Sequence, residues 1–271
     1  MDPAPFILLR GGGDLASGVA VRLFRCGFRL LITELPQPRA IRRLVSFAQA
    51  VYAGSAQVEG ITATLIGEAQ AAFQAASEGE IPVLVDPAAD VRRSLKFAAI
   101  VDGRMRKQPP EIGLEAAPVM IGLGPGFTAG IDCHAVVETQ RGHRLGRVIW
   151  QGPAAPDTGQ PGMIAGQAEG RLLRAPGEGR IQARVPLGSS VAAGQTVAEI
   201  GPHQVVAPFA GVVRGLLHDG LLVAAGEKIG DVDPRGKPEY CREVSDKALA
   251  VAGGVLEALL TQPEIRLALR G

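Results

Sequence analysis

Residues Phe6–Glu34 read FILLRGGGDLASGVAVRLFRCGFRLLITE, and this stretch decides the fold class that the sequence predicts. A short apolar run, Phe6–Leu9, leads into three consecutive glycines. Apolar residues then recur at helical spacing as far as Gly27, and a second apolar run, Leu30–Thr33, follows. This order predicts a strand, a helix and a second strand, which is the opening of a Rossmann-like domain.

The glycines of this stretch match a phosphate-binding pattern. Gly11-x-Gly13-x-x-Ala16 fits the dinucleotide fingerprint, and Glu34 stands where an acid would meet a ribose hydroxyl. Gly11, Gly13 and Glu34 are therefore predicted cofactor-binding residues. Asp14, however, puts a carboxylate in the first turn of the helix, where it could cap the helix and would repel a phosphate. Binding of NAD(P) and use of the same frame for another ligand both remain open.

Further apolar runs extend the predicted sheet. They lie at Val51–Tyr52, Ile61–Leu65, Pro82–Asp86, Phe97–Asp102 and Val119–Leu123, with a helix near Glu68–Ala76. Together they predict a mostly parallel sheet. Asp102 and Arg104 fall at the carboxyl end of a predicted strand, which is the usual ligand side of an open α/β sheet. Both are predicted cofactor-binding residues.

The segment Pro38–Ala50 is a predicted basic helix. Its residues Arg39, Arg42 and Arg43 share one face, because they are spaced three and four positions apart. Such a face is either solvated or a clamp for a phosphate or another anion, since a guanidinium fork matches those groups. Under the second interpretation Arg42 binds the anion of a cofactor.

A second glycine-rich loop follows the predicted strand Val119–Leu123. Gly124 and Gly126 would let the backbone approach a ligand and turn its N–H groups inward, which makes an anion-binding concavity. A tight turn with no ligand is the alternative. Under the functional interpretation both glycines bind the cofactor.

Three side chains with acid–base chemistry come shortly after this loop: Asp132, His134 and Glu138. In an extended segment His134 and Glu138 project from the same face. We predict these three as catalytic residues that orient the reactive end of a ligand or carry protons. A solvated strand is the plainer interpretation. No metal site is predicted, because no two of these residues form an i, i+4 pair on a helix and no cysteine cluster supports them.

Composition excludes several classes of protein. The chain has 271 residues, of which 46% are apolar and 20% charged, so it can bury the cores of two modest domains. A net charge of +1 and an aromatic content of 4% argue against binding to nucleic acid or to anionic membranes. Three dispersed cysteines predict a reducing compartment. With no signal-peptide pattern or membrane-length apolar run, we expect a cytoplasmic protein.

The later part of the chain repeats itself. Leu173–Ile200 and Val205–Val232 align at one constant offset, and each contains A-P-x-x-G followed by V-A-A-G. Neither half could bury its own apolar face, so the two should pack as one small β domain. The pattern resembles biotinyl and lipoyl domains, which are barrel-sandwich hybrids. The hairpin Gly201–Gln204 between the halves has no lysine, which excludes attachment of lipoate or biotin there.

These observations predict three parts. Residues 1–165 form a Rossmann-like α/β domain, and residues 168–236 form a barrel-sandwich-hybrid-like β domain. Residues 241–271 form a C-terminal helix that packs back on the body. Pro153–Gly166, rich in proline and glycine, is the predicted linker or long loop.

Several long motifs together resemble one family. They are RGGGDLASGVAVRLFRCGF, TELPQPRAIRRLVSFAQAVYAG, VDGRMRK, GLGPGFTAG with the D-x-H that follows, the A-P-x-x-G repeat and SDKALAVAGGVLEA. This set resembles the YqeB-type family, accessory proteins of selenium-dependent molybdenum hydroxylase systems. Over a shorter span, the opening resembles the Rossmann domain of xanthine dehydrogenase accessory and sulfuration factors.

The resemblance implies a cytoplasmic protein that helps to mature a molybdenum hydroxylase, its client. The molybdenum cofactor, a pterin, carries a phosphate or nucleotide that the glycine loops and arginines could hold. Two alternatives of other classes stay open: an NAD(P)-dependent oxidoreductase and a non-catalytic docking scaffold. Whether the chain turns over a substrate and whether it forms a homo-oligomer also stay open.

Overall fold

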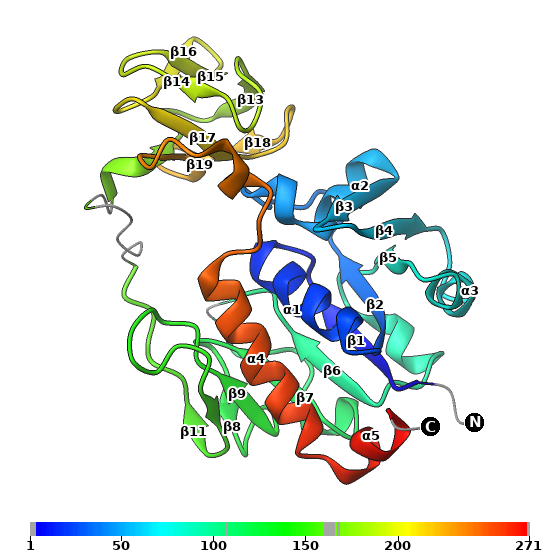
Figure 1. The fold of residues 1–271 in the computed structure, drawn as a ribbon. Helices are drawn as coiled ribbons and strands as arrows, with labels where there is room; N and C mark the ends of the chain where they lie inside the picture. Colours follow the sequence, from blue (N-terminus) through cyan, green and yellow to red (C-terminus); the bar gives the residue numbers. More distant parts are fainter. Residues whose placement is uncertain (1–3, 107, 160–165, 167–168, 270–271) are drawn as a thin grey trace. The chain divides into compact units, whose positions relative to one another are not determined.

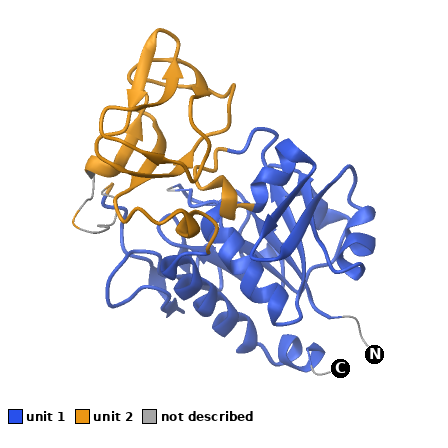
Figure 2. Cartoon of the chain, turned by 45° about the horizontal axis from the view of Figure 1, so that its top comes forward, with its two compact units in different colours: residues 1–38, 47–158, 244–271 blue, residues 39–46, 159–243 orange. Residues whose placement is uncertain are grey.

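The computed structural model describes residues 4–106, 108–159, 166 and 169–269. The chain divides into two compact units (Figures 1 and 2). The first unit consists of Met1–Pro38, Phe47–Thr158 and Val244–Gly271, and the second of Arg39–Ser46 and Gly159–Glu243. The chain therefore leaves the first unit twice and returns to it twice.

One mixed sheet forms the centre of the first unit. Its strands are β1 (Phe6–Arg10), β2 (Arg29–Glu34), β3 (Ser55–Val58), β4 (Ile61–Ile66), β5 (Ile81–Val85), β6 (Ala99–Asp102), β7 (Met120–Leu123), β9 (Ala135–Val137) and β10 (Val148–Ile149). They lie in the order β10-β9-β7-β6-β1-β2-β5-β4-β3. The two edge pairs, β3–β4 and β9–β10, are antiparallel, and the pairs between them are parallel. Strands β1, β6, β7 and β9 are buried along their whole length, as expected for parallel strands covered on both faces.

The helices of the first unit are α1 (Asp14–Arg25), α2 (Ala50–Ala53), α3 (Ala71–Ser77), α4 (Asp246–Leu260) and α5 (Pro263–Ala268). Helices α1 and α4 pack side by side over the sheet (Figure 1). Their contact is close at Gly18, where an added Cβ would lie 2.7 Å from the Cβ of Ala248. The hydroxyl of Ser245 caps α4 by accepting a hydrogen bond from the Ala248 N–H. A helix in the predicted C-terminal part, 241–271, is confirmed over Asp246–Leu260.

Shorter elements complete the first unit. Strands β8 (Thr128–Ala129) and β11 (Gly152–Pro153) form an antiparallel pair. The 3₁₀ turns are η2 (Phe47–Gln49), η3 (Asp90–Arg93) and η4 (Leu114–Ala116).

Two antiparallel sheets make up the second unit. One has the order β12-β19-β17-β14 and the other β16-β15-β13-β18. The strands are β12 (Leu172–Arg174), β13 (Gly179–Ala183), β14 (Ser190–Val191), β15 (Thr196–Ile200), β16 (His203–Val206), β17 (Gly211–Leu216), β18 (Leu222–Val223) and β19 (Lys228–Asp233), with 3₁₀ turns η1 (Arg43–Val45), η5 (Glu169–Arg171) and η6 (Pro238–Cys241). Each sheet takes strands from both sequence repeats, and the apolar residues of both repeats share one core. The internal repeat predicted from the sequence is confirmed.

The fold class predicted from the sequence is wrong and needs two corrections. The large sheet does not follow a Rossmann strand order, because β5 lies between β2 and β4 and antiparallel strands form both edges. Only α1 and α3 form α-helical crossovers between neighbouring parallel strands among the described residues. The second unit contains two separate four-stranded antiparallel sheets rather than the single barrel-sandwich hybrid that we predicted.

Two local predictions also fail. Pro38–Ala50 is not one basic helix, because Arg39–Ser46 leaves the first unit and only short 3₁₀ turns form in this segment. The predicted strand Val51–Tyr52 is a turn of α2. In the predicted linker Pro153–Gly166, residues 160–165 lie outside the described part of the chain, as do the predicted domain limits at 165 and 168.

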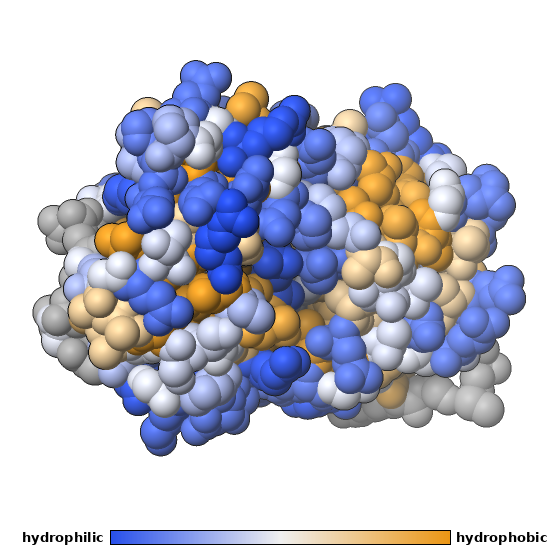
Figure 3. All heavy atoms as spheres, turned by 90° about the horizontal axis from the view of Figure 1, so that it is seen from above, coloured by the Kyte–Doolittle hydropathy of each residue, from blue (hydrophilic) through white to orange (hydrophobic). Residues whose placement is uncertain are grey.

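On the face that Figure 3 shows, hydrophilic residues alternate with limited patches of apolar residues. No helix in the described residues is both long enough and apolar enough to span a membrane.

Candidate functional site

The candidate site lies at the carboxyl edge of the parallel strands, where the order of connections changes direction. From β1 the chain moves to β2 on one side, whereas β6 and β7 lie on the other side. Loops leave such a point in opposite directions, and ligands of open α/β sheets bind in the crevice between them. Arg10 is the last residue of β1 and Asp102 the last of β6, so both stand at this point.

A buried ion pair joins the two strand ends. The Nη1 atom of Arg10 donates to Oδ2 of Asp102 at 2.9 Å, and the two side chains are 2% and 1% exposed. Burial lowers the pKa of Arg10 to about 10, although the negative charge of Asp102 partly offsets this effect. The Nε atom of Arg10 is buried without a hydrogen-bond partner in the described structure. A buried donor without an acceptor destabilises the folded protein, so a ligand with a hydrogen-bond acceptor at this position would be stabilised.

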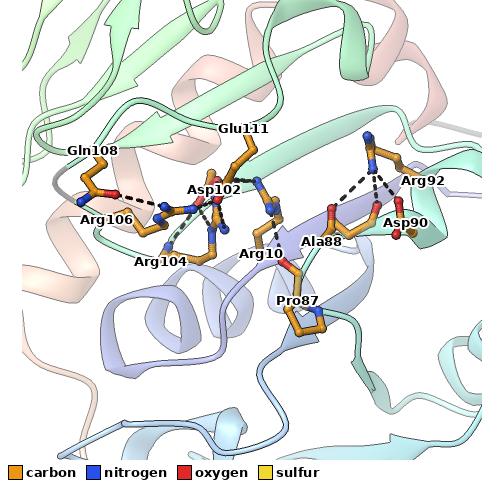
Figure 4. Close-up of polar contacts among 11 residues, drawn as sticks. Arg10, Pro87, Ala88, Asp90, Arg92, Asp102, Arg104, Arg106, Gln108 and Glu111 are labelled. Carbon is orange, nitrogen blue, oxygen red and sulfur yellow. Dashed lines mark hydrogen bonds and ion pairs between the residues drawn. The ribbon is translucent and has the colours of Figure 1, made fainter.

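Further arginines surround this pair (Figure 4). Arg104 donates to Asp102 at 2.7 Å and to Glu111 at 2.7 Å. Arg106 also pairs with Glu111, and Arg10 reaches the same carboxylate at 3.5 Å. One glutamate, with its side chain 49% exposed, is therefore shared by three guanidinium groups. With Asp102 and Glu111 set against three arginines, the cluster carries one excess positive charge.

The first glycine loop lies beside this cluster, and each of its glycines has a different environment. An added Cβ at Gly11 would lie 3.1 Å from Cγ of Arg104, and one at Gly12 would lie 2.7 Å from the backbone nitrogen of Ala48. Gly13 is the N-cap of α1, with a φ of −66°, and an added Cβ would meet nothing within 4 Å. Close packing therefore explains why Gly11 and Gly12 have no side chain. At Gly13 there is open space in front of the N-terminus of α1.

Glu34, at the end of β2, folds back onto the same loop. Its carboxylate accepts hydrogen bonds from the Gly12 N–H at 2.7 Å and from the Leu35 N–H at 2.8 Å. Burial raises the pKa of Glu34, and these two hydrogen bonds and the charge of Arg104 oppose that shift. Asp14 is the first residue of α1 rather than its cap, and its carboxylate accepts from the Leu15 N–H.

The second glycine loop reaches the same edge of the sheet. An added Cβ at Gly126 would lie 3.0 Å from the carbonyl oxygen of Gln108, so this loop lies against the segment after β6. An added Cβ at Gly124 would overlap Thr139, the residue two positions beyond β9. The structure thus places at this carboxyl edge the predicted cofactor-binding residues Gly11, Gly13, Glu34, Asp102, Arg104, Gly124 and Gly126.

Arg42 does not join this group. It belongs to the second unit, where its guanidinium donates to the carbonyl oxygens of Tyr240 at 3.0 Å and Glu243 at 3.1 Å. These hydrogen bonds tie the segment 39–46 to the end of the same unit. The sequence interpretation assumed a helix here that does not form.

The predicted catalytic residues Asp132, His134 and Glu138 are not brought together. His134 precedes β9 and Glu138 follows it, so the two lie at opposite ends of the strand. Each side chain is bonded to the backbone: Asp132 accepts from Thr128 N–H at 2.8 Å and His134 Nδ1 from Met120 N–H at 2.9 Å. Buried Glu138 accepts from the N–H groups of Gln140 and Ala155 at 2.7 and 2.8 Å. Their catalytic role stays a prediction, and the three side chains do not point to one common site.

The sequence analysis missed three residues of this region: Arg10, Glu111 and Lys247. Arg10 is the charged end of an otherwise apolar strand, which is a signal the sequence does carry. Lys247 lies in the first turn of α4, and burial lowers the pKa of its amine despite the nearby carboxylate of Asp14. Glu111 has no signal that separates it from other loop glutamates. Among the residues described, no group of three or more His, Cys, Asp or Glu side chains could hold a metal ion.

Comparison with known proteins gives one strong match in sequence. The chain is 50% identical over 254 residues to "Uncharacterized protein YqeB" of Escherichia coli strain K12. The match covers 94% of this chain and 47% of that protein. No protein-family model matches the chain.

Solved structures give only distant matches. The product-bound ectoine utilization protein EutE (DoeB) from Ruegeria pomeroyi is 13% identical, with a TM-score of 0.26, over 84% of this chain and 85% of that one. A succinylglutamate desuccinylase/aspartoacylase from Rhodobacter sphaeroides is 14% identical, with the same TM-score and the same coverage. Similarity at this level does not establish a shared fold.

The sequence match supports the predicted resemblance to the YqeB-type family. The description of that relative names no activity, so a role in selenium or molybdenum chemistry gains no support from it. The chain is thus similar to YqeB over nearly its whole length and spans about half the length of that relative.

Proposed function

We propose that the carboxyl edge of the first unit binds the phosphate or other anionic group of a small cofactor. We further propose that the chain is an accessory protein that holds this cofactor, a pterin or a nucleotide, during maturation of a molybdenum hydroxylase. The arginine cluster and the glycine loops support the first part. The motif resemblance supports the second.

The position of Glu111 carries the proposal. Its half-exposed carboxylate lies among the guanidinium groups of Arg10, Arg104 and Arg106. Such a carboxylate occupies the place that a ligand's anion would take, because guanidinium groups bind carboxylates and phosphates with the same paired geometry. The ligand would displace Glu111 and take over its ion pairs.

The surrounding residues fit an anionic group. Arg104, 18% exposed, and Arg106, 36% exposed, can donate to it, while buried Asp102 holds Arg104 in place. The unpartnered Nε of Arg10 offers one further donor, and the space at Gly13 lets a ligand approach the N-terminus of α1. A pterin cofactor would supply its own redox chemistry to the client, so the role of these residues is to bind and orient.

A pair of opposite substitutions tests the anion site. Glu111→Gln removes the internal competitor and should tighten pyrophosphate binding about tenfold, whereas Arg104→Gln should weaken it by a similar factor. Isothermal titration with pyrophosphate measures both. Asp90→Asn, a substitution of an exposed acid outside the cluster, is the control. Weaker or unchanged binding in Glu111→Gln would contradict the proposal.

The accessory role needs a separate test. The protein purified from its own cells is examined by native mass spectrometry together with molybdenum analysis. A bound pterin that is lost in Arg104→Gln, with loss of molybdenum hydroxylase activity in cells carrying that variant, is the expected result. Full hydroxylase activity in those cells would refute the maturation role and leave the anion site standing.

The oxidoreductase alternative makes a different demand on the structure. A nicotinamide nucleotide needs Glu34 to meet a ribose hydroxyl, but the carboxylate of Glu34 is engaged by the Gly12 and Leu35 N–H groups. Glu34 would have to give up these two hydrogen bonds before it could bind a ribose hydroxyl. Saturable NAD binding that disappears in Glu34→Ala would favour this alternative.

A further inference from the structure

A cavity lies at the amino ends of the parallel strands in the first unit. Its volume is about 700 Å³, within the range of ordinary small-molecule sites. It is lined by residues that precede three parallel strands: Phe97 before β6, Pro118 before β7 and His134 before β9. The proposed anion site lies at the carboxyl ends of these strands, whereas this cavity lies at their amino ends.

The lining of this cavity combines apolar side chains with charged and polar ones. Leu95, Phe97, Leu114 and Pro118 supply apolar contact area. Phe97 is 8% exposed and belongs to the core of the unit, so this wall is firmly held. Apolar side chains beside groups that fix the orientation of a ligand are typical of a site for a small organic molecule.

His134 presents a single defined donor to this cavity. Its Nδ1 accepts a hydrogen bond from the Met120 N–H at 2.9 Å, so Nδ1 carries no proton. The proton of the neutral ring is therefore on Nε2, which has no protein partner among the described residues. Nε2–H is a donor held in place by the backbone at the start of β7.

Lys96 supplies the free positive charge. It lines the cavity, its side chain is exposed, and it forms no ion pair in the described part of the chain. Arg92 also lines the cavity, but its guanidinium is already bonded to the carbonyl oxygen of Ala89 at 3.0 Å and paired with Asp90 at 3.5 Å (Figure 4). Glu115 adds one negative charge to the lining and would repel a ligand that carries two.

We propose that this cavity binds a small organic monoanion, a carboxylate attached to an apolar ring or branched chain. Lys96 and the Nε2–H of His134 take the carboxylate, and Leu95, Phe97 and Leu114 hold the apolar part. The single free cation and the presence of Glu115 select against phosphates. The site takes a different ligand class from the carboxyl-edge cluster.

Benzoate and its uncharged isostere benzamide test the charge requirement. Nuclear magnetic resonance of the full-length, ¹⁵N-labelled protein follows the backbone amides of Ala116 and Ala117, which line the cavity. Benzoate should shift these amides saturably, and benzamide should bind about tenfold more weakly or not at all. Equal responses to both probes, or no saturable shift with benzoate, would overturn the proposal.

Two matched variants test the residue assignment. Lys96→Gln should weaken benzoate binding about five- to tenfold. Arg93→Gln removes a neighbouring cation that is 74% exposed and does not line the cavity, and it should leave the affinity unchanged. Both positions are exposed, so both variants should fold. Equal affinity in Lys96→Gln and the unmodified protein would refute the role of Lys96.

Discussion

The buried pair between Arg10 and Asp102 should be the most sensitive electrostatic feature of the first unit. The perturbation is Asp102→Asn, which keeps the shape of the side chain and removes its charge. Arg10, with its side chain 2% exposed, then loses its close counter-charge at the end of β1 and keeps only the longer ion pair with Glu111, at 3.5 Å. Arg104 loses the same partner, but it is closer to the surface and retains Glu111.

The expected cost follows from this burial. Breaking a buried ion pair by neutralising one partner typically costs about 3 to 5 kcal/mol, because the remaining charge cannot be solvated. Burial already lowers the pKa of Arg10 to about 10, so burial destabilises the charged form of Arg10 even with Asp102 present. The double variant Arg10→Met/Asp102→Asn removes both charges and should therefore recover a large part of the lost free energy of unfolding.

The single tryptophan makes the assay specific. Trp150 belongs to the first unit, so its fluorescence during urea denaturation reports on that unit. With a denaturant dependence of about 2 to 3 kcal/mol per molar urea, the transition of Asp102→Asn should move down by roughly 1 to 2.5 M. The matched control is Asp90→Asn, whose acid is 58% exposed, and it should cost less than about 1 kcal/mol.

Two results would refute this reasoning. A loss below about 1 kcal/mol for Asp102→Asn would mean that the pair behaves like a surface pair. A double variant that is destabilised by the sum of the two single effects would mean that Arg10 and Asp102 do not interact energetically.

Three further predictions concern neighbouring features. Gly12→Ala should destabilise the first unit by about 1 to 3 kcal/mol, because the added Cβ would meet the Ala48 backbone. Gly13→Ser should keep the stability, because the serine hydroxyl can cap α1, and should weaken pyrophosphate binding. Thermal melts measure the stability of both variants, and titration with pyrophosphate measures their affinity. The pKa of Lys247 in the folded protein lies below the 10.5 of an ordinary lysine. At a pH between these two pKa values the unfolded chain binds more protons than the folded protein, so the free energy of unfolding should rise with pH in that window. That rise should be absent in Lys247→Met when unfolding is measured across alkaline pH. Burial raises the pKa of Cys133 to about 12, so in native protein exposed Cys26 should react with a thiol reagent first, and equal labelling of Cys133 in mass spectra would contradict this.

The local elements of the first unit were largely predictable from the sequence. Apolar runs bounded by glycines located β1, β2, β6 and β7, because central parallel strands are apolar on both faces. The repeat of the second unit was equally visible, since its two halves keep the same turn residues in the same order. Strand order was not predictable, because nothing local in β5 indicates that it pairs with β2 and separates that strand from β4.

The candidate site was predictable in part. The glycines and the charged strand end at Asp102 and Arg104 follow from the rule that ligands bind at the carboxyl edge. Arg42 failed as a site residue because its helix was inferred from charge spacing alone. The grouping of His134 with Glu138 assumed one long strand, whereas β9 ends between them and each side chain satisfies the backbone at its own end.

The path of the chain between the units has a consequence for synthesis on the ribosome. Helix α4, which covers α1 at Gly18 and buries Val251, Val255 and Leu259, is synthesised only after the whole second unit. Until then the nascent first unit exposes the apolar surface that α4 will cover. The second unit can close around the segment 39–46 earlier, because all its strands precede α4. A nascent chain whose residues up to 243 have left the exit tunnel, with α4 still inside it, should therefore hold a folded second unit and an unfinished first one, which is the form that would need a chaperone.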